Sequence, residues 1–284
     1  MKKVILIGSR GFIGSYIFRQ LSKYKKFIVH EGYKENINIL KKDSFITAFN
    51  KVKPDYIINT AAFSHLDPLS LPEIFKINCN AIIDIIDFLE KSSFQGKFIN
   101  TSSALIYGSK INGKIKETNN YNPEYKYAIA KAAVDKVIDE LGDKIECISV
   151  RPFNCIGIGH REDYLVPKIV SHFREKKRTI TLGNIRTKRD YIDVRDVSRM
   201  YVDILNTKKR FKSFNLATGK SFSAQNIINK ARKITGHRIQ VLCNKNLIRS
   251  NDAENVCGSN VRIKSIGFRY KYEIEDTLKW MIFS

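Results

Sequence analysis

The sequence lacks the usual signals of a membrane or secreted protein. No apolar run approaches the roughly 18–20 residues needed to cross a bilayer, and the apolar run Val4–Ile7 stops at Gly8, short of a signal-peptide core. The five cysteines are scattered and form no Cys-x-x-Cys pair, so they indicate neither a zinc site nor a disulfide framework. We therefore expect a soluble cytoplasmic protein that binds no membrane and no metal.

Acidic residues are also scarce: 28 Asp and Glu stand against 50 Lys and Arg, which gives a net charge of +22. This balance fits either a nucleic-acid surface or a solvated, lysine-rich one. The basic residues lie in short runs along the whole chain, and no stretch interleaves them with aromatic residues as a base-stacking platform would. We do not expect nucleic acid as a partner; attraction of anionic substrates such as phosphates stays open.

Strand-like and helix-like segments alternate, and 43% apolar residues are ample for a core. Short apolar runs bounded by turns and separated by helical patterns are typical of βαβ units. We predict an α/β fold with a Rossmann-type, doubly wound parallel sheet that binds ligands at the carboxyl ends of its strands. The predicted strands are Val4–Ile7, Phe27–Val29, Tyr56–Asn59, Lys97–Asn100 and Glu146–Val150, and the predicted helices are Phe12–Leu21, Ser44–Asn50, Asn80–Glu90 and Tyr125–Leu141.

The pattern becomes less regular after Pro152. We predict a dinucleotide-binding domain over residues 1–153 and a smaller, mixed substrate-binding region over 154–284, with about 187–216 returning to the first domain. The elements predicted there are the strands Ile180–Leu182, Tyr191–Val194 and Phe214–Leu216 and a helix over Ala224–Thr235 that ends at Gly236.

Three glycines, Gly8, Gly11 and Gly14, follow the first predicted strand and open the first predicted helix. Glycine permits the tight turn and lets the backbone approach phosphates, and the helix N-terminus offers N–H groups and a favourable dipole. The loop is predicted to bind the pyrophosphate of a nicotinamide dinucleotide; the alternative is a purely structural turn.

The Gly-x-x-Gly-x-x-Gly spacing resembles that of extended short-chain dehydrogenases/reductases, in particular the nucleotide-sugar-modifying epimerase/dehydratase family. The resemblance continues through most of the chain. It implies cofactor contacts from segments that match the family's landmarks. These residues are Gly8, Arg10, Gly11, Phe12, Ile13, Gly14, Glu31, Asn38, Ile39, Ala61, Ala62, Asn78, Thr101, Tyr127, Lys131 and Phe153. The pair Ala61-Ala62 matches the end of the family's fourth strand.

Two residues bear on the choice between NAD and NADP. Glu31, at the end of the second predicted strand, suits the ribose 2′-hydroxyl of NAD. Arg10 lies where some relatives hold the 2′-phosphate of NADP, which a planar guanidinium suits, and Lys34 is placed to help. Both cofactors stay open, with Arg10 favouring NADP.

A Tyr-x-x-x-Lys pattern places Tyr127 and Lys131 on one face of a predicted helix. Ser103 stands in a strand-to-turn segment that resembles the family's Ser-Ser-Ser-Ala-x-x-Tyr-Gly, and it precedes the tyrosine by 127 − 103 = 24 residues, as the family requires. The resemblance makes these three residues catalytic: Tyr127 is the acid/base, Lys131 favours its phenolate, and Ser103 orients the reacting oxygen. A second match, Tyr164 and Lys168, is set aside because Pro167 opposes a regular helix outside its first turn.

The substrate side rests on the resemblance. The segments around residues 151–157, 189–197 and 249–252 resemble the family's Arg-Pro-Phe-Asn, Arg-Asp-Phe-Ile and Arg-Pro-x-Asp motifs. They imply that Ser103 and Asn154 contact the sugar or phosphate, that Arg189 and Arg249 bind the diphosphate, and that Asp252 binds the nucleotide ribose. The implied substrate is a nucleotide-diphosphate sugar, as used in polysaccharide biosynthesis.

The residues after Ser103 narrow the reaction. Dehydratases of the family carry Asp-Glu there and GDP-fucose synthases a cysteine, whereas this chain has Ala104-Leu105. Neither can exchange a proton, which leaves reduction of a 4-keto-6-deoxy sugar, or 4-epimerisation on retained NAD. A non-catalytic binding or regulatory protein is the alternative of another class. The resemblance also implies a homodimer built from the helices near Asn80–Glu90 and Tyr125–Leu141.

Overall fold

The computed structural model describes residues 1–64, 66–247 and 253–284. Its contacts divide the chain into two compact units. Unit 1 comprises Met1–Gly108, Asn119–Pro152 and Ser198–Asn215, and unit 2 comprises Ser109–Thr118, Phe153–Val197 and Leu216–Ser284. Each unit is therefore assembled from segments that are distant in the sequence.

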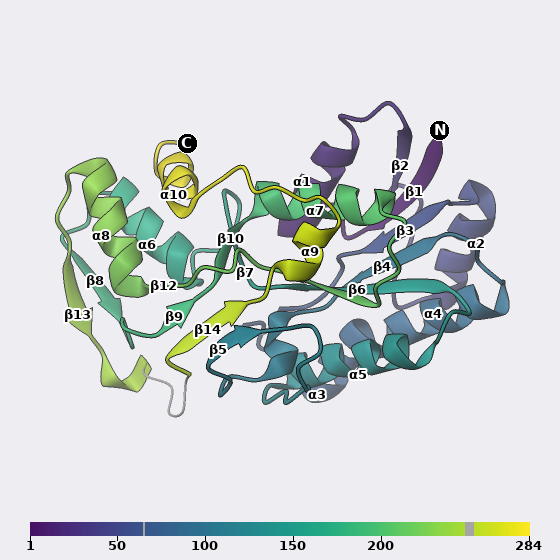
Figure 1. Cartoon of the computed structure of the whole chain (residues 1–284), viewed down its shortest axis with the longest axis horizontal. Coiled ribbons are helices and arrows are strands. Elements are labelled where there is room, and N and C mark those ends of the chain that lie inside the picture. Colours follow the sequence, from purple (N-terminus) through teal and green to yellow (C-terminus); the bar gives the residue numbers. More distant parts are fainter. Residues whose placement is uncertain (65, 248–252) are drawn as a thin grey trace. The chain divides into compact units, whose positions relative to one another are not determined.

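Unit 1 alternates strands and helices around one sheet (Figure 1). Its strands are β1 (Lys2–Ile7), β2 (Phe27–Glu31), β3 (Tyr56–Asn59), β4 (Lys97–Thr101), β6 (Glu146–Pro152) and β11 (Ser213–Leu216). Its helices are α1 (Phe12–Leu21), α2 (Lys42–Val52), α3 (Leu71–Phe75), the π-helix η1 (Lys76–Asn80), α4 (Ala81–Lys91), the 3₁₀-helix η2 (Ala104–Tyr107), α5 (Lys126–Glu140) and most of α7 (Val194–Asn206).

The six strands lie in the order β11-β6-β4-β3-β1-β2. The pairs β1–β2, β1–β3, β3–β4 and β4–β6 are parallel, so the carboxyl ends of these strands meet at one edge. Figure 1 shows α1 and α7 on one side of the strands and α4 and α5 on the other. The predicted α/β class with a doubly wound parallel sheet is confirmed.

Strands β1, β3 and β4 are buried on both faces, because nearly all of their successive residues are buried and these point to opposite faces of the sheet. Helices α2, α4 and α5 pack on one face through residues such as Phe45, Ile82 and Val134, which form one cluster with Ile5 and Ile57. Burial of such side chains contributes about 1.5–3 kcal/mol each. The chain from Gly32 to Lys41 forms no strand, so Ala61-Ala62, which resembles the end of a fourth strand, follows the third strand β3.

Unit 2 is mixed in architecture. Its elements are β5 (Gly113–Ile115), β7 (Asn154–Ile156), α6 (Leu165–Arg174), β8 (Thr179–Leu182), β9 (Lys188–Arg189), β10 (Tyr191–Asp193), β12 (Phe222–Ser223), α8 (Ala224–Thr235), β13 (Gln240–Cys243), η3 (Lys245–Leu247), β14 (Asn255–Gly258), α9 (Val261–Ser265) and α10 (Ile274–Ile282). One sheet has the order β12-β9-β14-β5, and β13 pairs with β8. Helices α6, α8 and α10 share one apolar cluster with residues such as Ile169, Ile227 and Leu278.

Pro167, in the second Tyr-x-x-x-Lys match, lies in the first turn of α6, where a proline is compatible with a regular helix. Tyr164 is the N-cap residue, with extended φ −84° and ψ 149°, and its ring stacks on His160 at 4.3 Å between centroids. Lys168 instead donates to the backbone oxygen of Thr181 at 3.0 Å. Tyr164 and Lys168 therefore do not share a helix face.

Candidate active site

The glycine loop joins β1 to α1 at the carboxyl edge of the sheet. Gly8 has φ +84°, a backbone angle that residues other than glycine rarely adopt, and a Cβ there would lie 2.6 Å from Thr60 Oγ1. A Cβ on Gly14 would lie 2.1 Å from the carbonyl oxygen of Gly8. Both glycines thus allow the loop, the first turn of α1 and the residue after β3 to pack closely. Thr60 completes the turn, because the oxygens of Ile7 and Gly8, at 2.9 and 3.1 Å from Thr60 Oγ1, share its one hydroxyl hydrogen.

A charged cluster lies at the carboxyl end of β2, the strand next to β1. Lys34 Nζ lies 2.7 Å from Glu31 Oε1, and the Arg10 guanidinium lies 4.8 Å from the centre of the Tyr33 ring. Burial raises the pKa of Glu31, but hydrogen bonds, led by that from Lys34, outweigh burial and leave the pKa below its ordinary value. The sequence-predicted residues Arg10 and Glu31 therefore flank one aromatic residue, Tyr33, which the sequence did not single out.

Other predicted cofactor residues hold backbone in unit 1. Asn78, buried in η1, accepts from the backbone nitrogen of Phe63 at 2.9 Å and donates to its oxygen at 3.0 Å. This clamp fixes the chain after β3, where Ala61 and Ala62 lie. Asn38 caps its own turn by accepting from the backbone nitrogen of Leu40 at 3.0 Å. Phe12 and Ile13 open α1, and Ile39 packs against the core beside α2.

The candidate catalytic residues come from the end of β4 and from α5. Ser103 is the N-cap of η2, and its Oγ accepts from the backbone nitrogen of Leu105 at 3.1 Å. Lys131 Nζ donates to the backbone oxygen of Thr101 at 2.8 Å and lies 6.0 Å from the ring centre of Tyr127, one helical turn earlier. Burial lowers the pKa of Lys131 to about 8, with Asp135 and then Cys79 opposing that shift.

Thr101 connects these groups to the sheet. Its hydroxyl donates to the oxygen of Asn59 at 2.7 Å, so the Tyr201 hydroxyl, also at 2.7 Å, is the donor to Thr101 Oγ1. The strand ends of β3 and β4 are thereby joined below Lys131.

The sequence missed a set of buried polar residues behind Lys131. Asp135 lies one helical turn after Lys131, and its carboxylate accepts from Ser149 Oγ at 2.7 Å and from Arg151 Nε at 2.8 Å. Arg151 Nη1 donates to the Tyr107 hydroxyl at 2.8 Å. The i, i+4 spacing of Lys131 and Asp135 is the one feature of the sequence that indicates an interaction between them.

Two of the predicted substrate residues lie together in unit 2. Asn154 Nδ2 donates to the backbone oxygen of Asp190 at 2.9 Å, and Arg189 precedes Asp190 in the chain. Burial raises the pKa of Asp190 to about 6, while donors from Thr218, Gly219 and Gly258 oppose that shift. Phe153 is also in unit 2, buried beside Gly258. Arg249 and Asp252 lie outside the described residues.

Comparison with known proteins decides the family. Residues 4–217 match the NAD dependent epimerase/dehydratase family. This span includes most of β1, the glycine loop and the candidate catalytic residues Ser103, Tyr127 and Lys131. The chain belongs to this family.

Relatives extend over nearly the whole chain. GDP-6-deoxy-D-talose 4-dehydrogenase from Aggregatibacter actinomycetemcomitans is 25% identical over 275 residues, covering 95% of this chain and 93% of the relative. A putative epimerase from Burkholderia cenocepacia has a TM-score of 0.88 at 22% identity, covering 99% and 97%. RMD from Pseudomonas aeruginosa, solved with NADPH, has a TM-score of 0.85 at 21% identity, covering 99% and 98%. These structures confirm the fold expected of the family.

The glycine loop fits the dinucleotide that the family name implies. A Cβ on Gly11 would meet only the Gly8 oxygen, at 3.2 Å, and Gly11 has ordinary angles of φ −72° and ψ 167°. Packing therefore requires glycine at 8 and 14 far more than at 11. Gly11 is the N-cap of α1 and has no side chain with which to cap this helix. Its small size instead suits the approach of a phosphate to the helix N-terminus.

No helix among the described residues is long and apolar enough to cross a membrane.

Proposed function

We propose that this chain is a reductase that uses NADPH or NADH to reduce the 4-keto group of a 6-deoxy sugar carried on a nucleoside diphosphate. The observation that carries the proposal is the set formed by Ser103, which follows β4 and precedes Ala104-Leu105, and by Tyr127 and Lys131 on α5. Lys131 is hydrogen-bonded to Thr101 at the carboxyl end of β4. The set supplies a proton donor for a carbonyl oxygen. The apolar pair supplies neither the acid and base of a dehydration nor the cysteine of an epimerisation through an enolate.

Ser103 is prepared to donate a hydrogen bond. A hydroxyl has one hydrogen and two lone pairs. Ser103 Oγ accepts from the Leu105 nitrogen through one lone pair, which leaves its hydrogen for another acceptor. In the proposed reaction that acceptor is the keto oxygen of the sugar, on which negative charge develops.

Tyr127 supplies the proton that this oxygen takes up. A free tyrosine has a pKa of about 10, so its phenolate needs support at neutral pH. Lys131, one turn further along α5 and anchored on Thr101, provides a positive charge for that purpose. The bound cofactor supplies the hydride.

The cofactor residues support NADP more than NAD. Arg10 and Lys34 are cations beside Tyr33, and a phosphate on the ribose gains charge-assisted hydrogen bonds from such groups. Glu31 is the residue that suits NAD, and its ion pair with Lys34 occupies both of these groups. The preference for NADP therefore rests on Arg10. The other proposed cofactor contacts are those predicted from the sequence.

The substrate assignment draws on Asn154 and Arg189, which flank Asp190, and on Arg249 and Asp252 from the sequence. Arginine binds a diphosphate through paired hydrogen bonds. The Aggregatibacter relative is named for position 4 of a GDP-6-deoxy sugar, which supports the same class here. We further propose a cytoplasmic homodimer formed through α4 and α5; light scattering that gives a monomer at micromolar concentration would contradict it.

Turnover of the purified protein tests the function. We expect GDP-6-deoxy-D-talose to be oxidised with NADP⁺ or NAD⁺, and the corresponding 4-keto sugar to be reduced with NADPH or NADH, as followed by nicotinamide absorbance. Tyr127→Phe is expected to abolish both directions and to keep the dinucleotide affinity of the wild type. Wild-type turnover by this variant would refute the mechanism.

Mass spectrometry of the protein as purified separates the alternative reaction. Retained NAD, together with interconversion of UDP-glucose and UDP-galactose without added cofactor, would show a 4-epimerase. An empty site that takes up NADPH supports the reductase.

A further inference from the structure

Three charged side chains are buried together in unit 1, behind the candidate catalytic lysine. Lys131 and Arg151 are each 1% exposed and Asp135 is 0% exposed. Burying a charge costs several kcal/mol unless an opposite charge and hydrogen bonds compensate it. Arg151 pairs with Asp135 at 2.8 Å, whereas no carboxylate of the described residues forms an ion pair within 4.0 Å of the Lys131 ammonium. The buried carboxylate of Asp135, one helical turn away, therefore bears on the charge of Lys131.

Asp135 is held rigidly from strand β6. Ser149 and Arg151 stand at alternate positions of β6, so both side chains point to the same face of the sheet. Ser149 Oγ binds one carboxylate oxygen at 2.7 Å and Arg151 Nε binds the other at 2.8 Å. Each oxygen thus has its own donor, which fixes the plane of the carboxylate on α5.

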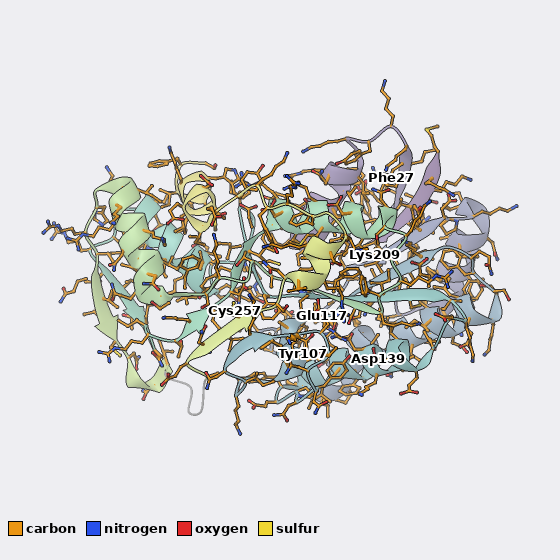
Figure 2. All side chains as sticks on the ribbon, viewed as in Figure 1. Phe27, Tyr107, Glu117, Asp139, Lys209 and Cys257 are labelled. Atoms are coloured by element: carbon orange, nitrogen blue, oxygen red, sulfur yellow. The ribbon has the colours of Figure 1, made fainter. Side chains whose placement is uncertain are left out.

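Arg151 is itself fixed on its far side. Its Nη1 donates to the Tyr107 hydroxyl, which donates to Asn215 Oδ1 at 2.8 Å. Its Nη2 donates to the Tyr121 hydroxyl, which donates to Asp139 Oδ2 at 2.8 Å. Figure 2 labels Tyr107 and Asp139, the residues on the two branches of this network. The guanidinium cannot turn to follow a change at Asp135.

Few groups set the charge of Lys131. Its pKa, which burial lowers to about 8, is raised by Asp135 on its own helix and by Cys79 on η1. Burial raises the pKa of Cys79, so at neutral pH this group is a thiol rather than an anion. Tyr127 lies on the same helix with its ring centre 6.0 Å from Lys131 Nζ.

Asp135 lies one helical turn after Lys131, and both side chains are buried. Burial raises the pKa of Asp135 as well, while the Arg151 guanidinium and the Ser149 hydroxyl oppose that shift and favour the carboxylate. Asp135 is therefore the carboxylate that acts on Lys131.

We propose that Asp135, oriented by Ser149 and Arg151, is a positioning residue that keeps Lys131 protonated while Tyr127 exchanges its proton. The inference rests on the proposed reductase function, in which Lys131 acts as a cation. In this proposal β6 supplies the residues that orient Asp135, and Asp135 acts on the reaction through Lys131 without contacting substrate or cofactor.

The pH profile of kcat tests this role. We expect kcat of the wild type to fall above about pH 8, where Lys131 loses its proton. In Asp135→Asn the ammonium loses its anion, so its pKa falls and the alkaline limb moves to lower pH by about one unit or more. Activity lost at pH 8 should return at lower pH, which a merely structural defect would not produce. An unmoved limb would overturn the proposal.

Asp139→Asn is the matched control. It removes the same charge from the same helix at the outer branch of the network, where Asp139 accepts from Tyr121. We expect its alkaline limb to coincide with that of the wild type; a shift equal to that of Asp135→Asn would show that the effect is one of net charge and would overturn the proposal. If Asp135→Asn fails to fold, Ser149→Ala keeps every charge but loosens the carboxylate, and a smaller shift in the same direction is expected. No shift in Ser149→Ala would again overturn it.

A titration of the free protein separates this inference from the proposed function. Lysine side chains labelled with ¹³C report their own protonation by NMR, and the Lys131 signal is assigned by its loss in Lys131→Met. A lower pKa of Lys131 in Asp135→Asn than in Asp139→Asn supports the coupling even if no sugar is reduced. Equal values in the two variants refute the coupling even if the reductase assay succeeds.

Discussion

Replacing Gly11 and Gly14 by alanine should separate packing from cofactor binding within one loop. At Gly14 a Cβ would lie 2.1 Å from the Gly8 oxygen, a contact with backbone that only a shift of the loop can relieve. Such overpacking costs about 1–3 kcal/mol, and the better helix propensity of alanine returns about 1 kcal/mol. We expect Gly14→Ala to lower the free energy of unfolding by up to about 2 kcal/mol, because this contact is with backbone.

Gly11→Ala should instead affect dinucleotide affinity more than stability. Its Cβ would meet one atom at 3.2 Å, and exchanging glycine for alanine at an N-cap costs about 0.5 kcal/mol. The same methyl group would stand where a phosphate approaches the helix N-terminus, so we expect at least a tenfold loss of dinucleotide affinity, about 1.4 kcal/mol.

Urea unfolding followed by circular dichroism measures the first quantity, and calorimetric titration with NADPH and NAD⁺ measures the second. Wild-type affinity in a folded Gly11→Ala variant would refute the assignment of this loop to the pyrophosphate. It would leave the loop as a structural turn.

Three further changes probe other parts of the molecule. Arg10→Ala should raise KM for NADPH about tenfold, the loss of roughly one charge-assisted hydrogen bond, with little change for NADH; an equal rise for both cofactors would contradict a role at the 2′-phosphate. Ser223→Ala removes the capping box of α8, in which Ser223 Oγ accepts from Asn226 at 3.1 Å, and should lower the free energy of unfolding by about 1 kcal/mol in urea titrations; an unchanged midpoint would refute it. Asp190→Asn places an NH₂ group against backbone donors of Thr218, Gly219 or Gly258 and should cost about 3 kcal/mol, so a thermal midpoint equal to the wild type's would show that these bonds contribute little.

Local signals were enough to predict several elements to the residue. Helix α1 spans Phe12–Leu21 and helix α8 spans Ala224–Thr235, as predicted, because each has a defined beginning and, in α8, Gly236 at φ +71° ends the helix. The strand Tyr56–Asn59 is likewise as predicted. Each of these segments carries its own periodicity and its own boundary.

Elements that depend on distant partners were not predictable. Strand β5 has three residues and pairs with β14, about 140 residues later, so its sequence gives no sign of it. The network behind Lys131 shows the same limit. The spacing within α5 puts Asp135 near Lys131, but only the placement of α5 against β6 brings Ser149 and Arg151 to the carboxylate. The roles of the remaining candidate residues are still predictions.

The π-helix η1 makes the length of its segment as important as its composition. A π-turn contains one more residue than an α-turn, and each residue of an α-helix advances the side chains by about 100°. Deleting one residue between Lys76 and Asn80 would therefore let α3 and α4 run together as a regular helix and would turn Asn78 away from Phe63. A change that keeps every helix intact would thus release the chain after β3. In this segment the spacing of the residues, counted along the chain, is itself a determinant of the site.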